Sequence, residues 1–132
     1  MSTTPTEDRP SKTSRAIGVA ISVLIVAFML FDAISHILKP KFVLDASVGM
    51  FPENQLVPIG VVALIVTVLY AIPRTAILGA VLLTGYYGGA VAVHLNAEHA
   101  IFTQVLFPVY FGTLAWLGLY LRDRRVRSLL PF

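Results

Sequence analysis

The sequence predicts an all-α integral membrane protein, a four-span antiparallel helical bundle with both termini in the cytoplasm. Three observations support this class. Of the 132 residues, 57% are hydrophobic and only 13% are charged, whereas soluble domains carry about 25% charged residues. The apolar residues are gathered into four long segments, and the basic residues flank these segments. A soluble chain of this size could not bury so much apolar side chain, so a bilayer is the expected solvent.

The four predicted spans cover residues 16–38, 56–72, 75–95 and 104–121, within one membrane domain over 16–121. The third is the clearest, because no residue between Arg74 and His94 carries a formal charge. As a helix with a rise of about 1.5 Å per residue, this run nearly matches a hydrocarbon thickness of about 30 Å. The first span could instead be a signal peptide, but its apolar run exceeds the usual length of about 7–15 residues.

The segments outside the spans have distinct compositions. Residues 1–15 are polar and contain two prolines, which predicts a disordered cytoplasmic tail. Residues 122–132 form a predicted basic cytoplasmic tail. Residues 39–55 are the long outer loop, with Pro40, Gly49 and Pro52 among apolar residues. Such a loop is either a functional lid or a segment lying in the membrane interface, and both alternatives stay open.

The positions of the basic residues predict the orientation. With four spans, both termini lie on the same side of the membrane. That side carries eight basic residues against two on the other, namely Arg9, Lys12, Arg15, Arg74, Arg122, Arg124, Arg125 and Arg127 against Lys39 and Lys41. An excess of Lys and Arg marks the cytoplasmic side, where Arg74 and the four arginines of the C-terminal tail would also contact anionic lipid head groups. The basic residues flank spans rather than forming a nucleic-acid-binding patch, so no nucleic acid partner is expected.

Polar side chains inside the spans are the candidate ligand-binding residues. Ionisable groups are costly in a bilayer and usually face the bundle interior. Asp32 and His36 are one helical turn apart, about 24 Å along the first span, and His94 is about 28 Å along the third. Tyr87 lies seven residues before His94 and shares its face. These four residues predict an outer polar pocket. Alternatively, Asp32 and His36 pair only with each other, His94 bonds a nearby carbonyl, and the tyrosines serve packing.

Small residues predict a helix contact on the third span. Gly85, Gly89 and Ala92 occur at small-xxx-small spacing, which lets another helix backbone approach closely. We therefore expect Gly89→Leu to be more disruptive than Gly18→Leu, because Gly18 lies near a helix end.

The composition excludes several kinds of chemistry. The chain contains no cysteine, so disulfides, thiolate metal sites and thiol redox chemistry by this chain alone are excluded. The three histidines and the acidic residues form no sequence-local ligand motif, so no metal is expected. No serine lies in a recognisable activating context for nucleophilic catalysis.

Four segments resemble the DoxX-like family of small four-helix bacterial membrane proteins. They are residues 69–75 (LYAIPRT), 79–86 (GAVLLTGY), 88–94 (GGAVAVH) and 116–123 (WLGLYLRD). The resemblance implies a multi-pass protein of the bacterial cytoplasmic membrane, linked to redox systems near the quinone pool, to sulfur oxidation or to oxidative-stress complexes. The chain departs from its relatives at His36, where they often have lysine, and at Asn96, where they often have arginine.

These observations lead to one functional hypothesis and two alternatives. The chain is expected to be an accessory subunit of a membrane redox system, not an enzyme on its own, that binds a quinone-like lipophilic molecule. Its expected partners are the lipid bilayer, a membrane or peripheral oxidoreductase, and a second copy of itself. The alternatives are a small-molecule carrier or permeability factor, with Asp32 and His36 as the coupling site, and a purely structural assembly subunit.

The predicted orientation can be tested with reporter fusions. A fusion at the C-terminus should report a cytoplasmic location, and a fusion within residues 39–55 should report the outside, because the basic residues concentrate at the termini. The reverse pattern would contradict every inference about depth.

Overall fold

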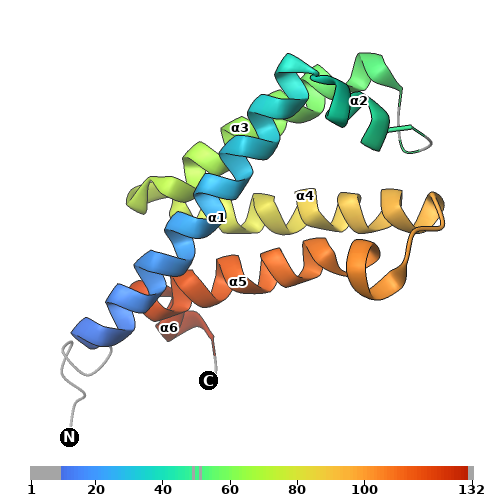
Figure 1. Ribbon diagram of the computed structural model, residues 1–132. Coiled ribbons are helices and arrows are strands. Elements are labelled where there is room, and N and C mark those ends of the chain that lie inside the picture. The colour runs from blue at the N-terminus through green and yellow to red at the C-terminus, as the bar shows by residue number, and fades with distance from the viewer. Residues whose placement is uncertain (1–9, 49, 51, 131–132) are drawn as a thin grey trace, which may run out of the picture.

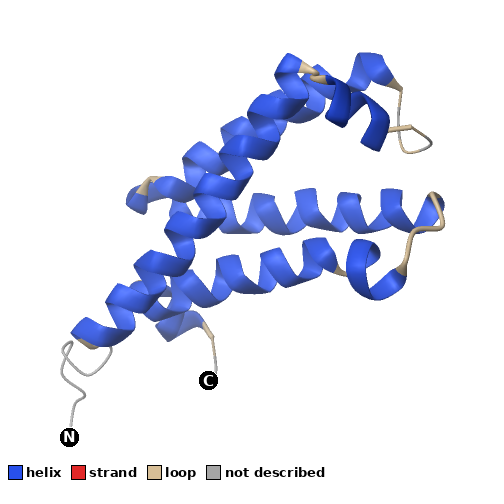
Figure 2. Ribbon diagram, viewed as in Figure 1, coloured by secondary structure: helices blue, strands red, loops and turns tan. Residues whose placement is uncertain are grey.

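The computed structural model describes residues 10–48, 50 and 52–130, and these residues form helices and no strands (Figures 1 and 2). The long helices are α1 (Lys12–Leu38), α3 (Leu56–Ala71), α4 (Ala76–Asn96) and α5 (Phe107–Arg122). Together with short adjoining turns, four segments are long and apolar enough to cross a membrane: Lys12–Leu38, Glu53–Ala71, Pro73–Asn96 and Ile101–Arg122. The predicted all-α, four-span fold is confirmed.

The four long helices form two pairs, α1 with α3 and α4 with α5. Helix α1 packs against α3 and α5, and α4 also packs against α3 and α5, so α1 and α4 lie diagonally across the bundle. Figure 1 shows that α1 and α3 diverge from α4 and α5 toward the end that carries the short helix α2 (Lys41–Ala46). The opposite end carries the short helix α6 (Arg124–Leu129) and the start of α1. We call these the α2 end and the α6 end.

The first helix begins earlier than the hydropathy predicts. Helix α1 starts at Lys12, because the side chain of Ser11 accepts a hydrogen bond from the backbone N–H of Ser14 at 3.0 Å and caps the helix. Residues 12–15 of the predicted disordered tail are therefore helical, which corrects that part of the prediction. Residues 1–9 of the predicted tail lie outside the described residues.

The predicted basic tail is not free between residues 122 and 130, the part of it that the structure describes. Asp123 caps α6 by accepting the backbone N–H of Arg125 at 2.8 Å, and Val126 is buried against the bundle. Arg127 donates to the hydroxyl of Ser14 at 2.7 Å, which joins α6 to the start of α1. The apolar side of α6 and these polar contacts hold it in place.

The connections at the α2 end also contain helical structure. Residues 39–55 include α2 and a 3-10 turn at Glu53–Gln55. The fourth span begins with a π-helical turn at Ile101–Val105, and α5 follows with Pro108 in its first turn, where the missing N–H costs no helical hydrogen bond. Each predicted span therefore occurs, with boundaries that differ from the predicted ones by at most four residues.

Tyr70 joins three helices near the α6 end. Its side chain is fully buried, and its hydroxyl donates to the carbonyl of Ala115 on α5 at 2.6 Å. The same hydroxyl lies 3.2 Å from the hydroxyl of Ser22 on α1. Arg122 donates to that serine at 2.9 Å, and its guanidinium carbon lies 5.5 Å from the centre of the Tyr70 ring. These contacts satisfy the buried polar groups without water and tie α1, α3 and α5 together.

Close helix contacts use glycines, among them Gly60 of α3, where a Cβ atom would lie 2.7 Å from the carbonyl oxygen of Ala33 on α1. A Cβ atom on Gly18 of α1 would lie 2.6 Å from the carbonyl oxygen of Gly118 on α5. A Cβ on Gly79 of α4 would clash with the backbone of Tyr70 on α3. Any larger side chain at Gly18 or Gly79 would therefore push two helices apart.

The predicted glycine contact on the third span is wrong for the helices of this chain. Among the residues that the structure describes, Cβ atoms on Gly85 and Gly89 would meet nothing within 4 Å, and Ala92 is exposed. Spacing alone does not show which small residues face another helix. The expected order of disruption is therefore reversed, since Gly18 and not Gly89 lies in a close helix contact.

The contribution of Tyr70 can be measured by removing its hydroxyl. Tyr70→Phe should lower the free energy of unfolding by about 1–3 kcal/mol, because it removes the hydrogen bond to Ala115 and leaves Ser22 with one partner fewer. Tyr110→Phe is the matched control, because its hydroxyl bonds the carbonyl of Phe102 at the surface. Reversible unfolding in mixed micelles gives both values. A smaller loss for Tyr70→Phe than for Tyr110→Phe would contradict the assignment.

Candidate ligand site between the helix pairs

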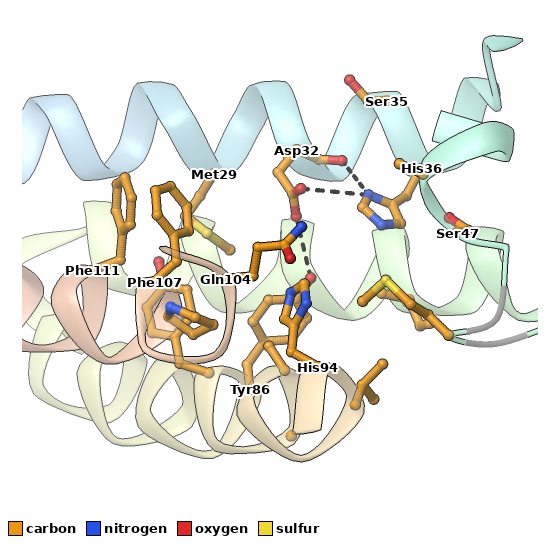
Figure 3. A pocket seen from close by; sticks show the side chains of 18 of the residues that line it. Met29, Asp32, Ser35, His36, Ser47, Tyr86, His94, Gln104, Phe107 and Phe111 are labelled. Carbon is orange, nitrogen blue, oxygen red and sulfur yellow. Dashed lines mark hydrogen bonds and ion pairs between the residues drawn. The ribbon is translucent and has the colours of Figure 1, made fainter. Parts of the chain in front are cut away.

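A cavity of about 660 Å³ lies between the two helix pairs at the α2 end (Figure 3). Its walls come mainly from α1, α2, α4 and the start of α5, and most of them are apolar. Helix α2 contributes Phe42, Val43 and Ala46, so this part of the predicted outer loop forms a wall of the cavity. The volume lies within the range of about 300–1,000 Å³ that is typical of small-molecule pockets.

Asp32, His36 and Tyr86 form a polar cluster in the cavity. The Oδ2 atom of Asp32 accepts a hydrogen bond from the Tyr86 hydroxyl at 3.3 Å, and Oδ1 lies 3.7 Å from Nδ1 of His36 (Figure 3). The same Nδ1 lies 2.7 Å from the backbone carbonyl oxygen of Asp32. Because a carbonyl oxygen only accepts, Nδ1 carries a proton. The helical spacing that predicted contact between Asp32 and His36 thus brings these side chains together, and α4 adds Tyr86.

His94 lines the same cavity but pairs with another residue. Its Nδ1 lies 2.7 Å from Nδ1 of His99, so one nitrogen donates and the other accepts. The chain reaches this arrangement through Glu98, whose φ of 58° lies in the left-handed region, and through a backbone hydrogen bond from His99 to the His94 carbonyl. The prediction that His94 and Asp32 border one pocket agrees with this geometry. The alternative, a bond from the His94 ring to a carbonyl, is not the contact observed.

Aromatic rings form the wall of the cavity that lies nearer the middle of the bundle. Phe28 of α1 stacks on Phe111 of α5 with ring centroids 4.4 Å apart, and Phe107 lies 4.7 Å from Phe111. Tyr87 also lines the cavity, and its side chain is only 7% exposed. Its buried hydroxyl has no hydrogen-bond partner among the described residues.

Three contributors were not among the predicted site residues. Tyr86 is not part of the predicted pocket, yet its hydroxyl donates to Asp32. His99 lies between the predicted third and fourth spans, and Gln104 is the first residue of the fourth. Both residues line the cavity. The side-chain oxygen of Gln104 accepts the backbone N–H of Ala100 at 3.3 Å, which leaves its amide N–H groups as donors toward a ligand. Their sequence positions gave no signal, because the turn at Glu98 decides where they lie.

No metal centre is built from the residues that the structure describes, since no three His, Asp or Glu side chains lie close enough to share an ion. The predicted pocket residues Asp32, His36, Tyr87 and His94 all border the cavity.

The basic residues at the α6 end have divided roles. Arg122, Arg125 and Arg127 hold protein groups: Arg125, for example, donates to the Pro73 carbonyl at 2.7 Å and pairs with Asp123 at 2.8 Å. Partial burial would raise the pKa of Asp123, but hydrogen bonds from the Arg125 side chain and backbone bring that pKa below its usual value. Arg74 and Arg124 are exposed, where head groups could reach them.

The helices and the cavity define a small four-span membrane protein with a ligand-sized cavity at one end of its bundle. The sequence model of the DoxX-like family matches residues 20–118, so the chain belongs to the DoxX-like family. The match includes every polar cavity residue described above and ends before α6. No curated protein and no solved structure matches the chain.

The bond between Asp32 and Tyr86 can be tested with a double-mutant cycle. Asp32→Ala and Tyr86→Phe should show a coupling of about 0.5–1.5 kcal/mol in unfolding free energy, because both remove the same hydrogen bond. The control cycle pairs Asp32→Ala with Tyr87→Phe, whose hydroxyl has no partner among the described residues. That cycle should show coupling near zero. Equal coupling in the two cycles would contradict the assigned bond.

Proposed function

We propose that this protein binds a quinone-like lipophilic molecule in the cavity and acts as an accessory subunit of a membrane redox system. The observation that carries the proposal is the lining of the cavity, which is largely apolar with a few convergent polar groups from Asp32, Tyr86, His94 and Gln104. Sites for apolar ligands have this composition, in which polar groups fix orientation and apolar walls provide most of the contact.

The polar groups suit a ligand with ring oxygens. The amide N–H of Gln104 and the hydroxyl of Tyr87 are donors with capacity for a carbonyl oxygen. Reduction of a quinone to a quinol takes up two electrons and two protons. Asp32, His36 and the His94–His99 pair are groups that can hold and exchange protons beside the ligand. The electrons would come from a partner oxidoreductase, which is why the proposed role is accessory.

A membrane-dissolved ligand also agrees with the exposed rings beside the cavity. Phe31 of α1 and Phe42 of α2 both line it, with centroids 6.2 Å apart, yet they are 61% and 56% exposed. In a bilayer these rings would contact lipid, so a ligand dissolved among the lipid tails could enter beside them. With the termini in the cytoplasm, as the basic residues favour, the cavity would lie in the outer half of a bacterial cytoplasmic membrane.

The carrier alternative requires a second opening. Passage across the membrane would need the α6 end to open, and there the Tyr70 contacts join three helices. Asp32 and His36 as a coupling site would therefore also require these bonds to break in each cycle. The structural-subunit alternative would use the exposed Gly85 and Gly89 for a partner helix.

Binding can be measured by equilibrium dialysis of a decyl-substituted benzoquinone against the protein in lipid nanodiscs, with protein-free nanodiscs as the blank. Gln104→Leu should weaken saturable binding about five- to tenfold, the value of one hydrogen bond. Gln55→Leu, at the 3-10 turn that precedes α3 and away from the cavity lining, is the matched control and should leave affinity unchanged. Uptake no greater than that of the blank would contradict the proposal.

A further inference from the structure

Three glycines of α4 share an unusual environment. Cβ atoms built on Gly85, Gly88 and Gly89 would each meet no atom of the described residues within 4 Å. Gly85 and Gly89 line the cavity, and Gly88 does not. The two cavity glycines are four residues apart, so they lie one above the other on the same helical face. They expose a strip of bare backbone about one helical turn, or 5.4 Å, in length.

Helix packing within the chain gives no reason for glycine at these positions. Glycine inside a helix is less stable than alanine, and close backbone approach is one of the few benefits that offset this cost. At Gly18 and Gly79 another helix supplies that approach, whereas at Gly85 and Gly89 no described residue does. Both glycines line the cavity, so a ligand bound there is a neighbour that would require these positions to stay small.

The rest of the cavity indicates the shape of that ligand. Aromatic rings stand on the α1 and α5 walls, where Phe28 lies one helical turn before Asp32 and stacks on Phe111. A flat ring has two faces, and it would fit between such side chains and a bare helical backbone. The strip on α4 is comparable in length to a substituted six-membered ring.

An independent observation points to an oxygen on the ligand. Tyr87 lines the same cavity, and its buried hydroxyl lacks a hydrogen-bond partner among the described residues. A buried hydroxyl that is left unpaired destabilises the protein, because it has lost its hydrogen bonds to water. An oxygen substituent on the bound ring would supply the missing partner.

We propose that Gly85 and Gly89 form a ledge on which a flat, oxygen-substituted ring lies, and that these two glycines select such rings over unbranched acyl chains. This inference rests on the proposed function and adds the shape of the ligand and the residues that recognise it. It also assigns Tyr87 as a hydrogen-bonding partner of the ring oxygen.

Substitution by alanine separates this role from folding. Gly89→Ala should raise thermal stability, because alanine favours the helix and its Cβ meets no atom within 4 Å. The same variant should lower the affinity for a decyl-substituted benzoquinone at least threefold, and Gly89→Leu should lower it tenfold or more. Gly88→Ala and Gly88→Leu are the matched controls, because Gly88 is equally uncrowded but lies outside the cavity lining. Both should leave affinity within twofold of the original protein.

Two further probes separate failure of this inference from failure of the proposed function. Nonylphenol carries a flat ring with a hydroxyl but is no quinone, and dodecanol has no ring. Binding of nonylphenol but not of the quinone, with sensitivity to Gly89→Leu, would overturn the quinone assignment and support the ledge. Equal competition by dodecanol, or equal effects of the Gly88 and Gly89 variants, would overturn the ledge. So would a dimer that both Gly88→Leu and Gly89→Leu dissociate, because the glycines would then serve contact with a second copy.

Discussion

The polar contacts of Tyr70 at the α6 end are the constraint on which the rest of the structure depends. In a bilayer, buried polar groups find no water and must pair with one another. The Tyr70 hydroxyl meets this requirement between Ser22 of α1 and the carbonyl of Ala115 on α5. Together with the close approach of Gly18 to Gly118, these bonds hold the helices at one end. The helix pairs can then diverge at the other end, where the cavity forms.

Hydropathy and charge predicted the four spans because both are local properties of the chain. The errors concern places where a cap or a distant contact decides the structure. Ser11 starts α1 four residues before the apolar run, and burial of Val126 docks α6 against the bundle. Gly85 and Gly89 have the same spacing as a helix-contact motif, yet close helix contacts occur at Gly18, Gly60 and Gly79. Only the arrangement of the helices shows which glycines face a backbone.

In the candidate site, too, contacts within one helix could be predicted from the sequence, whereas contacts between segments could not. Asp32 and His36 are four residues apart on one helix, so their contact followed from helical geometry alone. Tyr86 joins Asp32 from another helix, and its hydroxyl could equally have faced lipid or a neighbouring helix. His99 reaches His94 only because Glu98 adopts a left-handed conformation, which the sequence does not signal. Sequence reasoning therefore placed Asp32, His36, Tyr87 and His94 near one another, where all four line the cavity, but it did not predict all of their contacts.

The two buried tyrosines, Tyr70 and Tyr87, distinguish the structural end of the bundle from the proposed binding end. Tyr70 has its hydroxyl fully engaged, since it donates to one helix and contacts a serine on another. Tyr87 is nearly as buried, but its hydroxyl has no partner among the described residues. A purely structural role would not explain that difference, because an unpaired buried hydroxyl is less favourable than the phenylalanine that could replace it. Unused hydrogen-bonding capacity beside an apolar cavity is what a site for an oxygen-bearing ligand requires, and it favours binding over simple packing as the role of this end.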